Sequence, residues 1–154
     1  MGRIMRRLLL ASTVVFAFFA ANAFADQVSM AEQQLFHDVN QERKAHGLPT
    51  LKSDEALANA ARKHAQRMAE QGATSHQFPG EANQLSRARA AGAHFSWLAE
   101  NVDEGASAST IHESFMKSPL HRANILDRDM DSIGIGIVER HGQMYAVEDF
   151  AKEK

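Results

Sequence analysis

Cysteine is absent from this 154-residue sequence, which excludes a disulfide scaffold, a thiolate metal site and a cysteine nucleophile. Glycine and proline are low, at nine and three residues, which excludes a fibrous chain. Basic charge is not in excess, since 17 Lys and Arg stand against 19 Asp and Glu, so nothing indicates a nucleic-acid partner. With 44% hydrophobic residues, the composition is that of one ordinary globular domain.

The first 25 residues have the three parts of a secretory signal peptide. Three arginines precede an apolar run over residues 8–19, and an Ala-x-Ala sequence ends at Ala25. We predict cleavage after Ala25. An uncleaved membrane anchor is the alternative, because residues 8–25 approach the roughly 20 apolar residues that a bilayer span needs. Polar residues inside that segment disfavour the anchor, and no cysteine follows it that could carry a lipid.

Cleavage there leaves residues 26–154 as a single domain with 14 basic and 19 acidic residues and a net charge of −5. A chain of about 129 residues buries enough surface to fold without disulfides. Export without any cysteine fits a bacterial periplasm or exterior. The predicted location is therefore secreted or periplasmic, with no stable membrane span once the signal peptide is removed.

Hydrophobic periodicity predicts helices first and a β-hairpin last. The expected helices cover residues 28–47, 54–71 with Ser53 as N-cap, 85–91, 110–117 and 119–126. The expected strands cover residues 97–102, 133–138 and 144–150. Gly134 and Gly136 share one strand face, so another element is expected to pack close to the backbone there. This pattern predicts the α+β class, with helices packed on a small antiparallel sheet.

Two metal-binding motifs are incomplete. His112-Glu113 begins like the zincin helix His-Glu-x-x-His, but Met116 stands where the second histidine is required. Three aspartates within residues 127–131 resemble the start of a calcium loop, yet Ser132 and Val138 occupy the positions that require glycine and glutamate. We predict a solvated loop there and no zincin helix.

Four histidine and glutamate side chains remain as candidates for chemistry. Glu100 lies between apolar residues on one strand face, so it is expected to point inward and to need a cation or hydrogen-bond donors. His121 is the third residue of a helix, whose dipole there favours the neutral imidazole that binds metals. His76 lies in a polar loop, and Glu113 faces either solvent or a cleft. Taken alone, each is more simply explained as a surface or hydrogen-bonded residue, and His64 as a satisfied core histidine.

An ordered series of short motifs resembles the CAP superfamily of cysteine-rich secretory, antigen 5 and pathogenesis-related proteins, in its cysteine-free bacterial branch. The match covers about residues 33–150. Its motifs are Asn40-Gln41-Glu42-Arg43, Gly47-Leu48, Leu51, Leu57, Ala60-Ala61, His64-Ala65, Met68-Ala69, Ser75-His76, Ala91-Gly92, Glu100-Asn101-Val102, Ser118-Pro119-Leu120-His121-Arg122-Ala123-Asn124-Ile125, Ile133-Gly134-Ile135-Gly136 and Asp149-Phe150.

The resemblance implies a three-layer α-β-α sandwich, a small antiparallel sheet flanked by helices. In that family two histidines and two glutamates line a cleft, and the match carries these roles to His76, Glu100, Glu113 and His121. Two imidazoles and two carboxylates form a ligand set suited to Zn²⁺ or another divalent metal.

Some positions depart from the family pattern. Phe115 stands where many members have tryptophan, which alters the cleft wall. The absent cysteines mean that accessory cysteine-rich modules, with their ion-channel or toxin roles, are not transferred. Arg122 and Asn124 match the family motif and are expected to support the turn that carries His121.

Three functions follow from these observations. The first is a secreted module that binds an extracellular or envelope ligand such as a lipid or a peptide. The second is a metal-dependent hydrolase of extracellular polymers, with Glu100 or Glu113 as the candidate general base. The third is a structural or adhesive envelope domain, in which the four side chains only brace the fold. The sequence identifies no nucleophile and no oxyanion donors.

Overall fold

Five helices and four strands follow one another along residues 30–153, the part of the chain that the computed structural model describes. The predicted signal peptide lies outside these residues. The elements are a helix over residues 30–45, β1 (Lys52–Ser53), α2 (Glu55–Gln71), α3 (Gln84–Ala90), β2 (Trp97–Gly105), α4 (Ala108–Lys117), α5 (Pro119–Ile125), β3 (Ser132–Arg140) and β4 (Gln143–Lys152).

The strands form one sheet in the order β1-β3-β4-β2. β3 and β4 form the predicted hairpin, and β2 pairs antiparallel with β4 from Trp97 opposite Lys152 to Gly105 opposite Met144. Because this pairing runs past Val102, β2 is three residues longer than predicted. One edge of the sheet is not antiparallel, since β1 pairs parallel with β3. A two-residue strand with exposed side chains has no periodicity from which to predict it.

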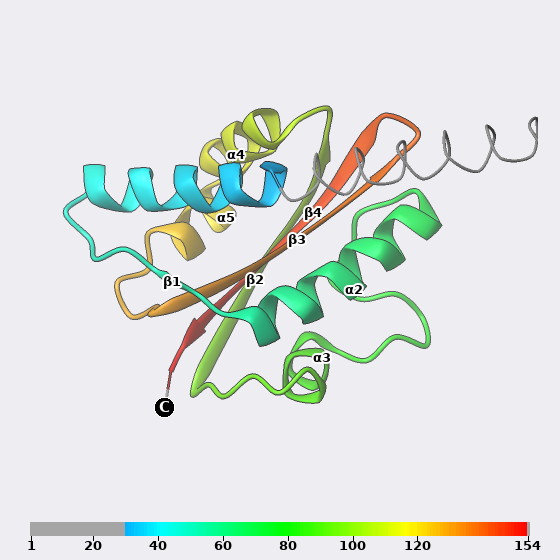
Figure 1. Cartoon of the computed structure of the whole chain (residues 1–154), viewed down its shortest axis with the longest axis horizontal. Coiled ribbons are helices and arrows are strands. Elements are labelled where there is room, and N and C mark those ends of the chain that lie inside the picture. Colours follow the sequence, from blue (N-terminus) through cyan, green and yellow to red (C-terminus); the bar gives the residue numbers. More distant parts are fainter. Residues whose placement is uncertain (1–29, 154) are drawn as a thin grey trace, which may run out of the picture.

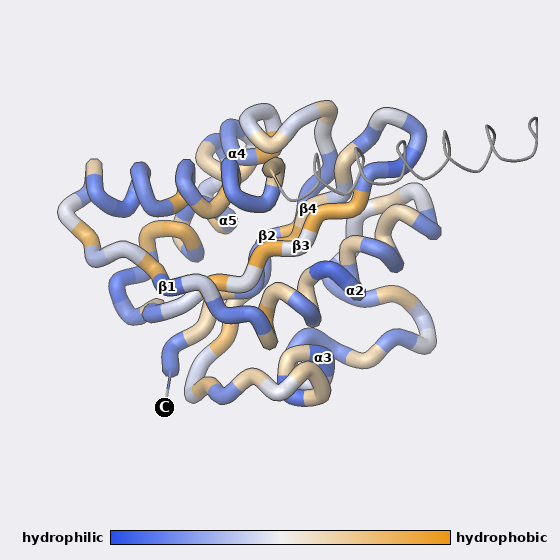
Figure 2. Tube along the Cα trace, in the orientation of Figure 1, coloured by the Kyte–Doolittle hydropathy of each residue, from blue (hydrophilic) through white to orange (hydrophobic). Residues whose placement is uncertain are grey.

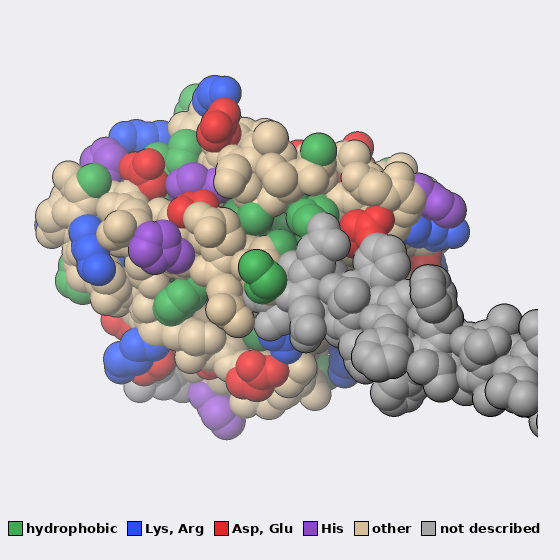
Figure 3. Space-filling model, turned by 45° about the horizontal axis from the view of Figure 1, so that its top comes forward, with side chains coloured by type: hydrophobic (Ala, Val, Ile, Leu, Met, Phe, Trp, Pro, Cys, Tyr) green, Lys and Arg blue, Asp and Glu red, His purple; other side chains and the backbone are tan. Residues whose placement is uncertain are grey.

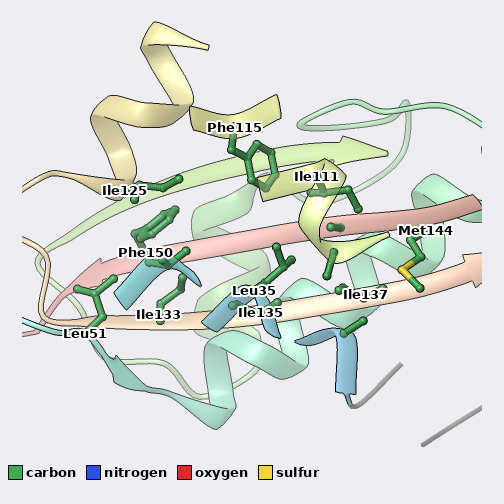
Figure 4. Close-up of a cluster of buried hydrophobic side chains, with 14 of the residues drawn as sticks. Leu35, Leu51, Ile111, Phe115, Ile125, Ile133, Ile135, Ile137, Met144 and Phe150 are labelled. Atoms are coloured by element: carbon green, nitrogen blue, oxygen red, sulfur yellow. The ribbon is translucent and has the colours of Figure 1, made fainter. Parts of the chain in front are cut away.

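The helix over residues 30–45, α4 and α5 cover one face of the sheet (Figure 1). The isoleucines of β3, at positions 133, 135 and 137, point into this layer. Leu35 of the first helix and Phe115 of α4 pack with them, and both are fully buried (Figure 4). This cluster is the larger part of the hydrophobic core.

α2 and α3 cover the opposite face, so the sheet lies between two helical layers (Figure 1). β3 presents Gly134 and Gly136 on this side. A Cβ atom added to either glycine would lie 2.1 Å from a backbone nitrogen of α2, that of Ala58 or Arg62. The backbone of α2 therefore rests directly on β3, which confirms the close approach predicted from the two glycines. The α+β class and the three-layer sandwich are also confirmed.

The start of α2 lies one residue later than predicted. Asp54, not Ser53, is the N-cap, and its carboxylate accepts a hydrogen bond from the backbone N–H of Leu57 at 3.0 Å. Ser53 belongs to β1, where it pairs with Ile133. The pairing of β1 with β3 keeps the chain extended through Ser53 and moves the helix start to the next residue.

Hydropathy follows the layers. The central strands β3 and β4 are mostly hydrophobic, whereas hydrophilic and hydrophobic residues alternate along the helices (Figure 2). Within residues 30–153, none of the helices has both the length and the apolar character that crossing a bilayer requires.

Candidate functional site

The four predicted site residues come from four different elements around β2. His76 lies in the connection between α2 and α3, and Glu100 lies in the middle of β2. Glu113 belongs to α4, and His121 belongs to the first turn of α5. The structure joins His76 to Glu100 directly. Among residues 30–153, no direct hydrogen bond or ion pair links the side chains of Glu113 or His121 to that pair.

Glu100 points inward, as predicted from its place on the strand, and its side chain is 2% exposed. One carboxylate oxygen, Oε1, lies 2.8 Å from Nδ1 of His76. The other, Oε2, accepts a hydrogen bond from the guanidinium of Arg87 at 2.5 Å. The buried carboxylate therefore has the cation and the donors that its burial requires.

His76 is the exposed end of this group, because 62% of its side-chain surface is open to solvent. Its Nδ1 faces Glu100, which leaves Nε2 for other partners. The hydrogen bond with Glu100 raises the pKa of His76 above its ordinary value, although partial burial acts in the opposite direction. A carboxylate behind an imidazole fixes the ring orientation and the site of its proton, as it does for many metal-binding and acid–base histidines.

Arg87 is a site residue that sequence reasoning missed. It lies on α3, and its guanidinium also donates to the backbone carbonyls of His76 at 3.1 Å and Ala82 at 3.0 Å. One side chain thus neutralises Glu100 and fastens the loop that carries His76. No local pattern distinguishes Arg87 from the surface arginines near it, since its partners come from other elements.

A second carboxyl lies beside Glu100 on the same face of the sheet. Asp149 of β4 is directly opposite Glu100 in the strand register and is 1% exposed. Gln84 of α3 donates a hydrogen bond to it at 3.0 Å. Burial, together with the negative charge of Glu100, raises the pKa of Asp149 to about 7. Arg87 and His76, the partners of Glu100, also act on Asp149, and both lower its pKa against these larger effects.

The loop that carries His76 is anchored by His64 of α2, which is fully buried. Nδ1 of His64 lies 2.7 Å from a carboxylate oxygen of Glu81, and Nε2 lies 2.7 Å from the carbonyl oxygen of Ser75. Both ring nitrogens thus have partners, which confirms the prediction of a satisfied core histidine. Its partners stand on both sides of His76 in the chain, so His64 holds the loop at two points.

His121 is placed differently. Its ring meets the ring of Phe115 edge-on, with centroids 5.1 Å apart and an interplanar angle of 81°. Burial lowers the pKa of His121, while Asp103 acts to raise it and His76 to lower it further. The neutral imidazole expected from the sequence is thus supported, with burial as the main cause.

Glu113 pairs with neither Glu100 and His76 nor His121. Its side chain is 67% exposed, and its carboxylate pairs with Lys117 one turn along α4 at 3.4 Å. In Figure 3, which turns the α4 end of the molecule forward, acidic, basic and histidine side chains are interspersed rather than gathered by sign. The exposed carboxylate of Glu113 is thus a solvated charge.

The described residues do not present a complete ligand set for a divalent metal. Both oxygens of Glu100 are already engaged, and Glu113 is paired with Lys117. Within residues 30–153, no group of three or more His, Asp or Glu side chains is arranged to hold an ion, and zinc ordinarily takes four ligands. What the site offers is an oriented, exposed imidazole at His76 and a neutral one at His121.

The comparisons with known proteins agree with the fold. The model of the cysteine-rich secretory protein family, CAP, matches residues 36–150. The protein YkwD of Bacillus subtilis (strain 168) is 31% identical over 113 residues, which are 73% of this chain and 44% of YkwD. An extracellular protein of Bacillus anthracis (strain Ames) containing an SCP domain superposes with a TM-score of 0.80 at 22% identity, over 86% of this chain and 43% of that protein. An outer surface protein of Borrelia burgdorferi gives a TM-score of 0.73 at 22% identity, over 79% of this chain and 92% of that protein.

The chain thus spans less than half the length of YkwD and of the B. anthracis protein. The structural likeness at 22% identity establishes a shared fold. The match to the family model extends over most of the described residues, from the middle of the first helix to Phe150 in β4.

Proposed function

Because the chain belongs to the cysteine-rich secretory protein (CAP) family, we propose that it acts outside the cytoplasm, secreted or periplasmic, and binds a ligand beside β2. The observation that carries this proposal is the exposed imidazole of His76 held by the buried Glu100–Arg87 pair. Burying an ion pair costs desolvation energy that an apolar core would not. Such an arrangement is better explained by the need to orient His76 than by stability.

The proposed site consists of His76, Glu100, Glu113 and His121, with Arg87 as an added member. We expect an extracellular or envelope ligand, such as a peptide or a lipid head group, with a polar group that meets Nε2 of His76. Zn²⁺ or another divalent ion is a further predicted ligand. Because the carboxylates are engaged as described, the two imidazoles are the donors available to an ion.

Calorimetric titration of the purified protein with Zn²⁺ tests this site. We expect His76→Ala and His121→Ala each to weaken binding at least tenfold. His94→Ala, at an exposed histidine just before β2, is the matched control and should bind like the parent protein. Binding that both site variants retain would overturn the proposed site, and a parent protein that binds no Zn²⁺ would overturn the metal prediction. Site variants that unfold would instead support the structural alternative.

The hydrolase alternative has less support from the geometry. Both oxygens of Glu100 are already engaged, one by the guanidinium of Arg87 and the other by Nδ1 of His76, which weakens its capacity as a general base. Among residues 30–153, Glu113 makes no hydrogen bond or ion pair with His76 or His121, and it pairs with Lys117 instead. Hydrolysis of a peptide or envelope polymer that disappears in a folded Glu100→Gln variant would favour this alternative over simple binding.

A further inference from the structure

α5 begins without the side-chain cap that usually starts a helix. Ser118 is the N-cap residue and Pro119 follows it, but the serine hydroxyl makes no capping hydrogen bond. The helix has only seven residues, too few to be stable by helix propensity alone. Its first turn carries His121, so contacts from outside the helix must hold that turn in place.

Asn101 provides such a contact. It follows Glu100 on β2 and therefore points to the opposite face of the sheet. Its side chain is fully buried, and its Nδ2 donates to the backbone carbonyl of His121 at 3.2 Å and to Oε2 of Glu148 at 3.0 Å. Asn124 of α5 donates in turn to Oδ1 of Asn101 at 2.9 Å. One amide thus ties both ends of α5 to β2 and β4.

We propose that Asn101 is a positioning residue for His121, with Asn124 and Glu148 as its partners. The amide fixes the backbone of the first turn of α5, and the ring of Phe115 then restricts the imidazole. This inference deepens the proposed function and rests on it, because it assigns an uncharged side chain, Asn101, to hold His121 of the proposed site. The expected support from Asn124 is explained in this way, whereas Arg122 contacts His46 at 3.0 Å instead.

Glu148 suits this task because it is a neutral acceptor. It is fully buried on β4, and burial raises its pKa to about 8. At neutral pH its carboxyl therefore receives the Asn101 hydrogen bond without placing an unpaired charge in the core. A glutamine at position 148 keeps the same acceptor in a similar shape.

Nuclear magnetic resonance of the protein tests the proposal without any ligand. Because the His121 ring stands edge-on to Phe115, its ring protons carry an aromatic ring-current shift that reports their position. We expect Asn101→Ala to move these signals toward the values of a solvent-exposed histidine. Glu148→Gln should leave them in place, since it keeps the acceptor for Asn101.

Asn40→Ala is the matched control for a merely structural effect. Asn40 is also a buried asparagine with two backbone partners, the N–H of Leu51 at 2.7 Å and its carbonyl at 3.3 Å, and it lies on the first helix. We expect this variant to lose stability without moving the His121 signals. Unchanged His121 signals in folded Asn101→Ala would overturn the proposal, as would equal displacement in Asn40→Ala. If Asn101→Ala does not fold, Asn124→Ala is tested instead. We expect this variant to move the same signals by a smaller amount, and unchanged signals would contradict the proposal.

Zn²⁺ affinity separates this inference from the proposed function. Loss of a supporting group beside a metal ligand usually weakens binding by about 10- to 100-fold. We expect that loss in Asn101→Ala and none in Asn40→Ala. If the parent protein binds no Zn²⁺ but the His121 signals move as stated, the positioning role stands and the metal prediction falls. If both variants lose affinity equally, the specific role of Asn101 is contradicted.

Discussion

The two sides of β2 hold an imidazole by different means. On the α3 side, charged groups hold the His76 ring itself, through the buried pair of Arg87 and Glu100. On the α5 side, the neutral amide of Asn101 holds the backbone of His121, and the ring is left to pack against an aromatic neighbour. The first imidazole is exposed and its pKa is raised, whereas the second is partly buried and its pKa is lowered. Adjacent residues of one strand thus produce two electrostatically opposite environments.

β4 supplies a buried carboxyl to each side. Asp149 faces Glu100, and Glu148 faces Asn101, because consecutive residues of a strand point to opposite faces. Burial raises the pKa of both acids, to about 7 for Asp149 and about 8 for Glu148. The charged side therefore depends on keeping its ions paired, while the neutral side depends on keeping its acid protonated.

Removing the cation from the charged side should have the largest effect. Arg87→Ala leaves Glu100 buried beside Asp149 without its main positive partner. Loss of one member of a buried pair costs about 3 kcal/mol or more of folding free energy. Urea unfolding of Arg87→Ala at pH 7 measures this loss. Arg67→Ala is the control, because Arg67 of α2 is partly exposed and lies 3.8 Å from its partner Glu70, and it should change stability by less than about 0.5 kcal/mol. Equal effects from the two variants would contradict the distinction between a paired buried ion and a solvated one.

On the neutral side, Glu148→Gln should change how stability depends on pH. The pKa of Glu148 is about 8 in the folded protein against an ordinary 4.5. Between these two pH values the folded protein therefore holds a proton that the unfolded chain has already lost. Stability therefore falls as pH rises from about 5 to 8, by up to about 1.4 kcal/mol per pH unit for this group. Glutamine cannot titrate, so urea unfolding at pH 5, 6, 7 and 8 should give a flatter profile for the variant. Parallel profiles for variant and parent protein would show that Glu148 is ionised in the fold.

Glu113→Gln should have the smallest effect, because Glu113 belongs to neither side. Its side chain is 67% exposed, and its carboxylate pairs with Lys117 in the next turn of the helix. Exposed pairs of this kind contribute less than about 1 kcal/mol, so thermal unfolding should change little. A loss above about 1 kcal/mol would mean that Glu113 supports the site through contacts beyond this helix. If the same variant weakens Zn²⁺ binding, the four-residue prediction gains support that stability measurements cannot provide.

The fold could be predicted where the determining features are local. The alternation of isoleucine and glycine in β3 predicts both the strand and the close approach of α2, since periodicity and a missing Cβ act within a few residues. β1 could not be predicted, because two exposed residues become a strand only through pairing with β3. The predicted N-cap of α2 is wrong by one residue for the same reason, since Ser53 pairs with Ile133 of β3.

Within the site, the inward direction of Glu100 could be predicted from its strand neighbours. Its proximity to His76 could be expected only from the family resemblance, because the two residues lie in different elements. Arg87 could not be found from sequence, because α3 must fold back before its side chain meets a strand 13 positions further along. Glu148 and Asp149 did carry a usable signal. Two consecutive acids in a strand with apolar neighbours on both faces cannot both reach water, so at least one must be buried with partners or protonated.

The central claim is that β2 supports two imidazoles of opposite character, one from each of its faces. The pKa of His76 is raised, and the pKa of His121 is lowered. A pH titration of the histidine ring nitrogens by nuclear magnetic resonance, in a single sample of the protein, tests it most directly. We predict that His76 keeps its proton to a higher pH than an ordinary histidine, whose pKa is 6.5, and that His121 loses its proton at a lower pH. Titration of both rings at the same pH, or in the reverse order, would contradict it.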